Sequence, residues 1–576
     1  MSSEPSSYLP YDEPDIVTIL IQSSFLLALN IINHIFDNLI FCGLIGQIFI
    51  GVAWGTPGGK LLNSETEHVI VQLGYLGLIL LVYEGGLQTE FSALKANALL
   101  SCAVAITGIV VPIGLSFSLL SLASATPLQA FAAGAALCST SLGTTFTILS
   151  TSGLATTRLG VVLTSAAMMD DVVGLVMVQV ISNLGGDDFS AVTVVRPIAV
   201  SIGLGVLVLL ICRFVAKPVT LWCQSVLENK KDGMVRSCVS SVYAALIIHT
   251  AILLGLVTGA TYAGTSNLFA AYLAGAAISW WDGEFTKPTP AASNTPNIQT
   301  TSSTHTQENI SSTTIPANTT PSTPSLPPPT TTTPSQTSGT ATFTRFYEPA
   351  LHRILKPLFF ASIGFAIPIT KLFSGPIMWR GIIYTILMLI SKLATGFWLL
   401  KFSVPIFSKL ALKFRRKTLK NSKLKKSQKP ITSNTGVQLQ HIPSQPSQPT
   451  TASSSSPTPA NTSLPRQPPK ANTTPTKVPL SLYPAAMLGT AMTARGEIGF
   501  LIASLAETTG VFSSQTTTPV ESSEIYLITT WAIVLCTIIG PLATGTLVKR
   551  VRRLEKELVA KGKSGREGPL GVWGLS

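Results

Sequence analysis

The stretch Ala166-Ala167-Met168-Met169-Asp170-Asp171-Val172-Val173-Gly174-Leu175 places two adjacent carboxyl groups near the middle of an apolar run. The run, residues 158–182, is long enough to cross about 30 Å of hydrocarbon as a helix that rises about 1.5 Å per residue. One ionisable group at the centre of a bilayer costs about 2.5–3.5 kcal/mol. The pair could instead lie at a span end among lipid headgroups, but the apolar or small residues on both sides favour the central position and a function there.

The two carboxyl groups cannot point in the same direction, because successive residues differ by about 100° around a helix axis. One of Asp170 and Asp171 can meet a protein partner while the other faces a water-filled cavity. Burial favours the protonated form of a carboxyl group, and hard cations prefer oxygen ligands. The pair therefore predicts a site at which a proton and a cation compete.

The rest of the chain shares the apolar character of this run. Of its 576 residues, 46% are hydrophobic and only 11% are charged, whereas soluble proteins carry roughly 25% charged residues. Apolar runs of roughly twenty residues recur and predict about thirteen spans, and hence an all-α polytopic membrane protein. The approximate positions of the runs are 16–36, 39–55, 68–88, 97–121, 127–150, 158–182, 192–215, 236–258, 262–281, 350–373, 376–403, 482–507 and 524–548.

A buried carboxylate requires a counter-charge, and Lys392 is the candidate. It lies deep in the run 376–403, too far from either end for its side chain to reach the interface easily. Buried lysine adjusts its protonation to its surroundings, so an Asp170–Lys392 pair could open when a proton or cation arrives. The alternative is a misplaced span boundary, which would put Lys392 at the interface.

Two apolar runs are interrupted by small, hydroxyl-bearing residues. The first interruption contains Thr140 and Ser141, and the second ends with Arg495 and Glu497. Interrupted helices in the two halves of a transporter place free carbonyls and helix ends at the midplane, although close helix packing explains either segment taken alone. Thr140 and Ser141 are candidate ligands. Arg495 and Glu497 could line the ion path, but a supporting network that fixes the crossing of the interrupted helices is favoured.

The formal net charge of +13 does not indicate a nucleic-acid partner, because the basic residues flank apolar runs. Nine Lys and Arg residues lie within 413–429, and a second basic cluster follows residue 548. Cytoplasmic loops carry such an excess, so the C-terminus is expected in the cytoplasm and the N-terminus on the opposite side. The Cys residues form no CxxC pair, so neither a disulfide framework nor a zinc site is expected.

Composition divides the chain into six segments. Two stretches dominated by Ser, Thr and Pro cannot bury enough apolar surface to offset chain entropy and are expected to be disordered. The segments are a first membrane part of about nine spans (1–282), a disordered cytoplasmic loop (283–349), two spans including Lys392 (350–412), a basic then disordered cytoplasmic loop (413–478), the last two spans (479–548) and a basic cytoplasmic tail (549–576).

Taken in order, several motifs resemble the monovalent cation:proton antiporter-2 branch of sodium/proton exchangers. They are Glu84-Gly85-Gly86-Leu87, Thr140-Ser141-Leu142-Gly143, the Asp170-Asp171 pair, Ala270-Ala271-Tyr272-Leu273-Ala274-Gly275, Phe359-Phe360-Ala361-Ser362-Ile363-Gly364, the span with Lys392, and Arg495-Gly496-Glu497-Ile498-Gly499. The resemblance covers nearly the whole chain apart from the two low-complexity insertions and the tails. The insertions resemble those of fungal members.

The resemblance implies an inverted-repeat fold of thirteen spans with two discontinuous crossing helices, a core domain and a dimerisation domain. It implies a homodimer in the lipid bilayer that exchanges Na⁺, Li⁺ or K⁺ for protons by alternating access. Asp171 would bind the proton or the transported Na⁺, and Asp170 would pair with Lys392. The double Asp favours Na⁺ or Li⁺. The resemblance implies a transporter rather than an enzyme, and no cofactor is expected.

Three alternatives stay open. One is K⁺/H⁺ exchange on the same scaffold, and another is a membrane sensor whose Ser/Thr-rich loops are the working part. The intact set of Asp170, Asp171 and Lys392 argues against the sensor. A channel is disfavoured because the sequence shows no repeated carbonyl filter or charged ring. The plasma membrane and a vacuolar or endosomal membrane both fit the predicted topology.

Overall fold

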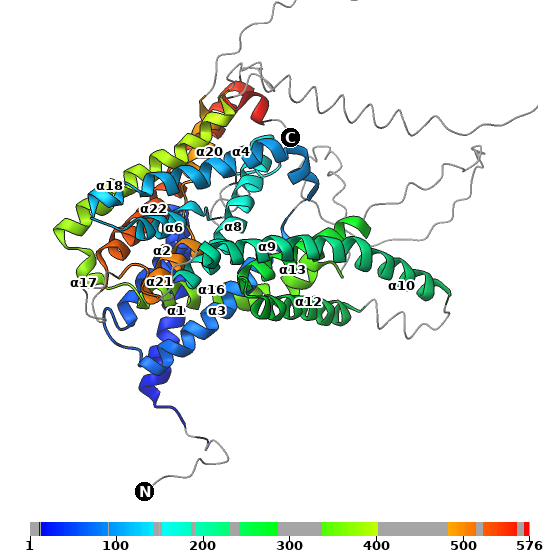
Figure 1. The fold of residues 1–576 in the computed structure, drawn as a ribbon, viewed down its shortest axis with the longest axis horizontal. Coiled ribbons are helices and arrows are strands. Elements are labelled where there is room, and N and C mark those ends of the chain that lie inside the picture. The colour runs from blue at the N-terminus through cyan, green and yellow to red at the C-terminus, as the bar shows by residue number, and fades with distance from the viewer. Residues whose placement is uncertain are drawn as a thin grey trace, which may run out of the picture. The chain divides into compact units, whose positions relative to one another are not determined.

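The computed structural model describes residues 11, 13–89, 91–141, 149, 152–185, 191–229, 241–285, 337–400, 482–513, 522–560 and 569–574. All of these except Leu400 belong to one compact unit that joins residues 1–399 to residues 481–576. Every regular element within the described ranges is helical (Figure 1). This agrees with the all-α architecture expected from the sequence.

Eight helical stretches in the described part of the chain are long and apolar enough to cross a membrane. They lie in α1 (Ile16–Ile40), α3 (Ser64–Leu87), α4 (Phe91–Ser116), α8 (Arg158–Leu184), α9 (Ala191–Ile211), α12 (Val242–Ala263), α18 (Gly375–Leu393) and α22 (Glu524–Ala560). The protein is therefore an integral membrane protein of helices. The count of thirteen spans and their inverted repeat stay predictions.

Shorter elements occupy the other predicted spans and the connections. They are α2 (Gly43–Trp54), α5 (Leu119–Leu122), α6 (Pro127–Cys138), a π-turn (Cys212–Ala216), α10 (Lys217–Asn229), α13 (Asn267–Phe285), α14 (Gly339–Phe346), α15 (Glu348–Ala350), a second π-turn (Leu351–Leu355), α16 (Lys356–Phe365), α17 (Ile369–Leu372), a 3₁₀ turn (Ala394–Leu399), α20 (Tyr483–Ala491), α21 (Glu497–Thr508) and a final 3₁₀ turn (Gly571–Gly574).

The short helix α6 lies in the interior of the bundle. A reciprocal capping pair, Thr126 with Gln129, and a proline at the first helical position start it. Its side chains facing the bundle are mostly alanines, and these are almost fully buried. Small side chains let α4 and α21 approach the α6 backbone closely. The helix ends at Cys138 because Ser139 adopts an extended conformation.

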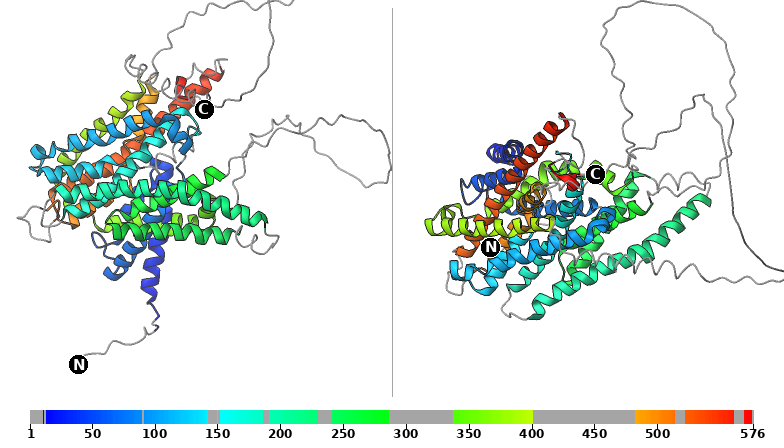
Figure 2. Two further views of the ribbon diagram at one scale, coloured as in Figure 1. Left: turned by 45° about the vertical axis from the view of Figure 1, so that its right-hand side comes forward. Right: turned by 90° about the horizontal axis from the view of Figure 1, so that it is seen from above.

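The helices α9 and α12 lie on the periphery of the bundle, beside α13 (Figures 1 and 2). Many of their large apolar side chains are exposed, including Ile202 on α9 and Ile247 on α12, each more than 60% exposed. An apolar surface of this extent is unfavourable in water but favourable against lipid. These helices therefore present the lipid-facing side of the unit.

The prediction that residues 283–349 are disordered is wrong for the end of that segment. Residues 339–346 form α14, which Ser338 caps by accepting a hydrogen bond from the Ala341 amide. Phe343 is 4% exposed and packs against the Tyr83 ring on α3. The composition of the segment as a whole hid this short amphipathic helix. Residues 286–336 and 401–481 lie outside the described residues, so the disorder expected there stays a prediction.

The predicted basic tail, residues 549–576, also begins inside a helix, because α22 continues to Ala560. Farther along, Leu570 is 2% exposed, and the Arg158 guanidinium lies 4.9 Å from the centre of the Trp573 ring. Leu570 joins the same apolar cluster as Leu159 and Leu163 on α8. The described end of the chain therefore packs against the helix that carries the two aspartates.

Close packing of α3 against α13 depends on two glycines, and this gives a testable prediction. A Cβ atom on Gly275 would lie 2.3 Å from the Tyr83 carbonyl oxygen, and one on Gly86 would lie 2.3 Å from the Tyr272 carbonyl oxygen. We expect Gly275→Ala to lower the free energy of unfolding by about 1–3 kcal/mol through overpacking. Thermal unfolding of the purified protein in detergent would measure it.

The matched control is Gly259→Ala on α12, where an added Cβ would meet no atom within 4 Å. That variant should be unchanged or slightly more stable, because alanine is the better helix former. Equal stabilities for the two variants would contradict the close approach of α3 and α13.

Candidate functional site

A fully buried ion pair lies at the centre of the site. Asp170 on α8 and Lys392 on α18 each have 0% side-chain exposure, and Lys392 Nζ lies 2.7 Å from Asp170 Oδ2. The same ammonium donates to the Cys138 carbonyl oxygen at 2.6 Å and approaches Thr140 Oγ1 at 3.0 Å. Thr140 Oγ1 also lies 2.9 Å from Asp170 Oδ2. The charge of Lys392 is therefore shared between the Asp170 carboxylate and the carbonyl oxygen at the C-terminal end of α6.

Two unwound segments meet beside this pair. Residues 139–141 follow the end of α6, and residues 492–496 separate α20 from α21. The Ser141 amide donates to the Ala494 carbonyl oxygen at 2.9 Å, and Thr140 Oγ1 donates to the Met492 carbonyl oxygen at 3.2 Å. Two donors of the first segment, which have no partner within a helix, are thus satisfied by carbonyl oxygens of the second segment. Residues 142–145 of the first predicted interruption lie outside the described residues.

Arg495 lies buried where the two unwound segments meet and links them. Its side chain has 0% exposure, and Nη1 donates to the Ser139 carbonyl oxygen at 2.7 Å. Its own carbonyl oxygen accepts a hydrogen bond from Thr537 Oγ1 on α22 at 3.1 Å. A buried guanidinium is costly unless it is hydrogen-bonded, so its contacts hold the two unwound segments and α22 in one arrangement.

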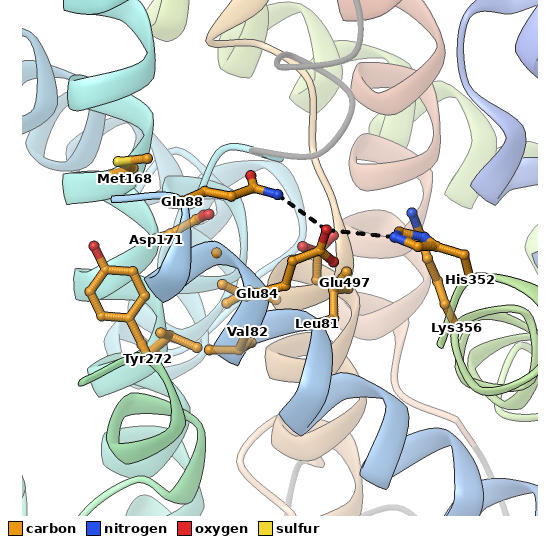
Figure 3. Close-up of a pocket in the computed structure, with 13 residues that line it drawn as sticks. Leu81, Val82, Glu84, Gln88, Met168, Asp171, Tyr272, His352, Lys356 and Glu497 are labelled. Atoms are coloured by element: carbon orange, nitrogen blue, oxygen red, sulfur yellow. Dashed lines mark hydrogen bonds and ion pairs between the residues drawn. The ribbon is translucent and has the colours of Figure 1, made fainter. Parts of the chain in front are cut away.

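Asp171 has a different environment from its neighbour. Its Oδ1 accepts a hydrogen bond from Ser139 Oγ at 3.0 Å, and its side chain lines a cavity of about 150 Å³ (Figure 3). Of the seven site residues expected from the sequence, Asp171 and Glu497 line this cavity. Asp170, Thr140, Ser141, Lys392 and Arg495 are instead buried in the junction of helices behind it.

Side chains from α3, α13, the second π-turn and the start of α16 complete the lining of the cavity. Glu84 Oε1 accepts a hydrogen bond from Gln88 at 3.1 Å and lies 3.6 Å from His352 Nε2. In the view of Figure 3, Tyr272 lies on the side of Asp171, and Lys356 lies on the other side beside His352. The cavity is therefore lined by polar side chains from several helices that are far apart in the sequence.

Two further residues belong to the site although the sequence analysis did not select them. Ser139 orients Asp171, and its place in the first hydroxyl-rich interruption was the available signal. A Cβ on Gly108 of α4 would lie 3.2 Å from both Asp170 Oδ2 and Lys392 Nζ. A glycine inside an apolar run carries no sequence signal that it faces an ion pair.

A group of three or more His, Cys, Asp or Glu side chains that could hold a resident metal ion is not found among the described residues. The site itself combines one ion-paired carboxylate, Asp170, with a second carboxylate, Asp171, that lines the cavity. Such a carboxylate can hold either a proton or a cation, since both neutralise the same charge.

Comparison with protein families shows what part of this chain is similar to. Residues 23–294, which include α8 and both aspartates, match the model of the sodium/hydrogen exchanger transmembrane family. Over these residues, the chain is similar to sodium/hydrogen exchangers. The finer prediction of the antiporter-2 branch and a fungal type stays a prediction.

Three curated proteins are similar to part of this chain. The high-affinity Na⁺/H⁺ antiporter NhaS3 of Synechocystis is 29% identical over 143 residues, which are 24% of this chain and 31% of that protein. The probable Na⁺/H⁺ antiporter GerT of Bacillus cereus is 30% identical over 159 residues (26% of this chain, 40% of GerT). The Na⁺/H⁺-K⁺ antiporter GerN of the same organism is 32% identical over 155 residues (26% and 39%). The matched region thus spans less than half of each relative.

Among solved structures, the sodium proton antiporter MjNhaP1 from Methanocaldococcus jannaschii matches 93% of this chain and 99% of its own, with 13% identity and a TM-score of 0.48.

The buried ion pair predicts an asymmetry between single and double substitutions. Lys392→Met would leave Asp170 buried without its counter-charge, which should lower the free energy of unfolding by about 3–5 kcal/mol. Asp170→Asn combined with Lys392→Met removes both charges and should recover much of that loss. Denaturant or thermal unfolding of the purified variants would measure the coupling.

Lys217→Met serves as the control, because Lys217 pairs with Glu284 where both side chains are partly exposed. Such a pair contributes about 0–1 kcal/mol. If the double variant were as unstable as Lys392→Met alone, the two buried charges would not compensate each other.

Proposed function

We propose that this protein exchanges protons for monovalent cations, Na⁺ or Li⁺ in preference to K⁺, across the membrane that holds it. The observation that carries the proposal is that two adjacent carboxyl groups have different surroundings. Asp170 is neutralised by Lys392 at 2.7 Å, whereas Asp171 lines a cavity and accepts one hydrogen bond from Ser139. The match of residues 23–294 to the sodium/hydrogen exchanger family supports the same function.

Competition at Asp171 couples the two fluxes. A charged carboxylate is costly to move into an apolar surrounding, and either a proton or a cation removes that cost. The site therefore changes its access from one side to the other only when it is loaded. Because one carboxylate cannot hold both ions together, inward movement of one is exchanged for outward movement of the other.

The predicted topology places the cavity on the cytoplasmic side. Glu84 lies at the end of a span that enters from the non-cytoplasmic side, and His352 follows the predicted cytoplasmic loop. A second cavity lies near Ser124, Lys371 and Glu524, at loops that the same topology assigns to the opposite side. The arrangement supports an inward-facing state in which Asp171 is open to the cytoplasm.

The remaining features belong to the same proposal. The two unwound segments serve as the discontinuous crossing helices, and Thr140 and Arg495 hold the ion pair and the crossing instead of binding the transported ion. Ser141 contributes its backbone amide to the crossing. The protein would act as a homodimer in a plasma, vacuolar or endosomal membrane, with a cytoplasmic C-terminus and without a cofactor.

Exchange of K⁺ is the second candidate, and one observation favours it. One of the relatives, GerN, is described as an Na⁺/H⁺-K⁺ antiporter and is 32% identical over the matched region. The described cavity wall contains carboxylates and a tyrosine, which are oxygen ligands that accept either cation.

Transport in liposomes tests the proposal directly. Purified protein would be reconstituted, a pH gradient imposed, and the response of a pH-sensitive dye to added Na⁺, Li⁺ and K⁺ recorded. We expect a response to Na⁺ and Li⁺ that is absent in Asp171→Asn, because the amide can neither take up a proton nor neutralise a cation. A folded Asp171→Asn protein that still exchanges cations would refute the role of Asp171.

Glu557→Gln is the control variant, because Glu557 is an exposed carboxylate paired with Arg553 near the end of α22. It should exchange at the wild-type rate. A folded wild-type protein that responds to none of the three cations would favour the sensor interpretation over transport.

A further inference from the structure

Glu497 lies at the junction between the unwound segment 492–496 and α21. The chain unwinds after Ala491, and Glu497 is the first residue of α21. Its side chain lines the same cavity as Asp171, and Figure 3 draws both among the residues of that cavity. The unwound segment therefore brings a second carboxyl group to the water-accessible side of the site, whereas Arg495, two residues earlier, is fully buried behind it.

The carboxylate of Glu497 differs from those of Glu84 and Glu507 by its lack of partners. Within the described ranges, no other residue donates a hydrogen bond to it or forms an ion pair with it. By contrast, Glu84 accepts a hydrogen bond from Gln88, and Glu507, on the same helix, accepts two from Ser523. A charged carboxylate in a confined cavity is energetically costly unless a partner compensates its charge. A cation bound beside Glu497 would remove that cost.

The negative charges around Glu497 further favour a cation at this place. Asp171 lines the same cavity, so the negative charges of the two carboxylates repel each other. Asp170 itself is neutralised by Lys392. Glu84, which pairs with His352, also lines the cavity, and so does Lys356. The lining therefore contains three carboxyl groups, of Asp171, Glu497 and Glu84, and one lysine.

The size of the cavity brings any ion in it near both carboxylates. A volume of about 150 Å³ corresponds to about five water molecules at about 30 Å³ each. A cation that enters and sheds part of its water therefore has oxygen atoms of both side chains within reach, and hard cations favour such ligands.

We propose that Glu497 is a second cation-binding residue, and that the transported cation is held between the Asp171 and Glu497 carboxylates. The inference rests on the proposed exchange function. It changes the role of Glu497 from support of the helix crossing to direct contact with the ion. The Ser139 hydroxyl, bonded to Asp171 Oδ1, leaves the second oxygen of Asp171 for the cation.

If Glu497 had a purely structural role, replacing it would have a different effect on the protein. A negative side chain at the start of α21 is favoured by the helix dipole, so Glu497 could serve only to stabilise that helix. Replacing it would then lower the stability of the protein with or without a cation. A cation-binding role predicts a change that depends on the cation.

The test compares Glu497→Gln, Glu497→Asp and Glu507→Gln with the wild type and Asp171→Asn. Two quantities are measured, namely the KM and maximal rate for Na⁺ in proteoliposomes, and the rise in Tm that added Na⁺ causes in detergent. We expect Glu497→Gln to raise KM about tenfold or more and to lose the Na⁺-dependent rise in Tm, with its Tm in Na⁺-free buffer near the wild-type value. Glu497→Asp should recover part of the affinity, and Glu507→Gln should behave as the wild type.

The outcomes separate this inference from the function on which it rests. If the wild type exchanges Na⁺, Asp171→Asn does not, and Glu497→Gln has an unchanged KM, the second cation-binding residue is refuted and the exchange function stands. A lower Tm in Na⁺-free buffer with an unchanged Na⁺-dependent rise refutes it in favour of the helix-stabilising role. A wild type that neither exchanges Na⁺ nor gains stability from it overturns both.

Discussion

The ion pair between Asp170 and Lys392 is the interaction on which the rest of the structure depends. It is fully buried and joins α8 to α18, and the same ammonium reaches the carbonyl end of α6. A pair of this kind is stabilising only when further hydrogen bonds satisfy its charged groups. The end of α6 supplies the Cys138 carbonyl oxygen to the ammonium, and the unwound segment that follows supplies the Thr140 hydroxyl to Asp170 Oδ2, whereas Asp170 Oδ1 has no hydrogen-bond partner among the described residues.

Several features follow from that constraint. Beyond the end of α6, the Ser141 amide and the Thr140 hydroxyl need acceptors, and the break between α20 and α21 supplies the Ala494 and Met492 carbonyl oxygens. The close meeting of these segments requires small residues around it, such as Gly108 beside the ion pair and Gly496 beside Ser141. Neutralising Asp170 in this way leaves Asp171 as the carboxylate of the pair that meets water. One interaction thus gives the two adjacent aspartates different surroundings.

Much of this could be inferred from residue type and spacing. Long apolar runs with few charges determine a helical membrane protein, because no other structure satisfies the backbone in lipid apart from a closed barrel. Two carboxylates and a lysine inside such runs are too costly to lack a role. The hydroxyl-rich interruptions indicated where helices would break, since Ser, Thr and Gly compete with the helix through local hydrogen bonds and flexibility. The short helix at residues 339–346 was missed because the average composition of a long segment conceals a few apolar residues.

The sequence by itself determined the class of the protein, its helical character and the identity of the charged residues within its apolar runs. Only the tertiary structure decided which of these residues share a cavity and which are buried behind it. Thr140 and Ser141 have the chemistry of ion ligands, yet they belong to the helix junction, whereas Glu497 lines the cavity with Asp171. The physical reason is that hydropathy and spacing fix a residue's depth in the membrane and its face on one helix. Its neighbours depend on how segments far apart in the chain pack together.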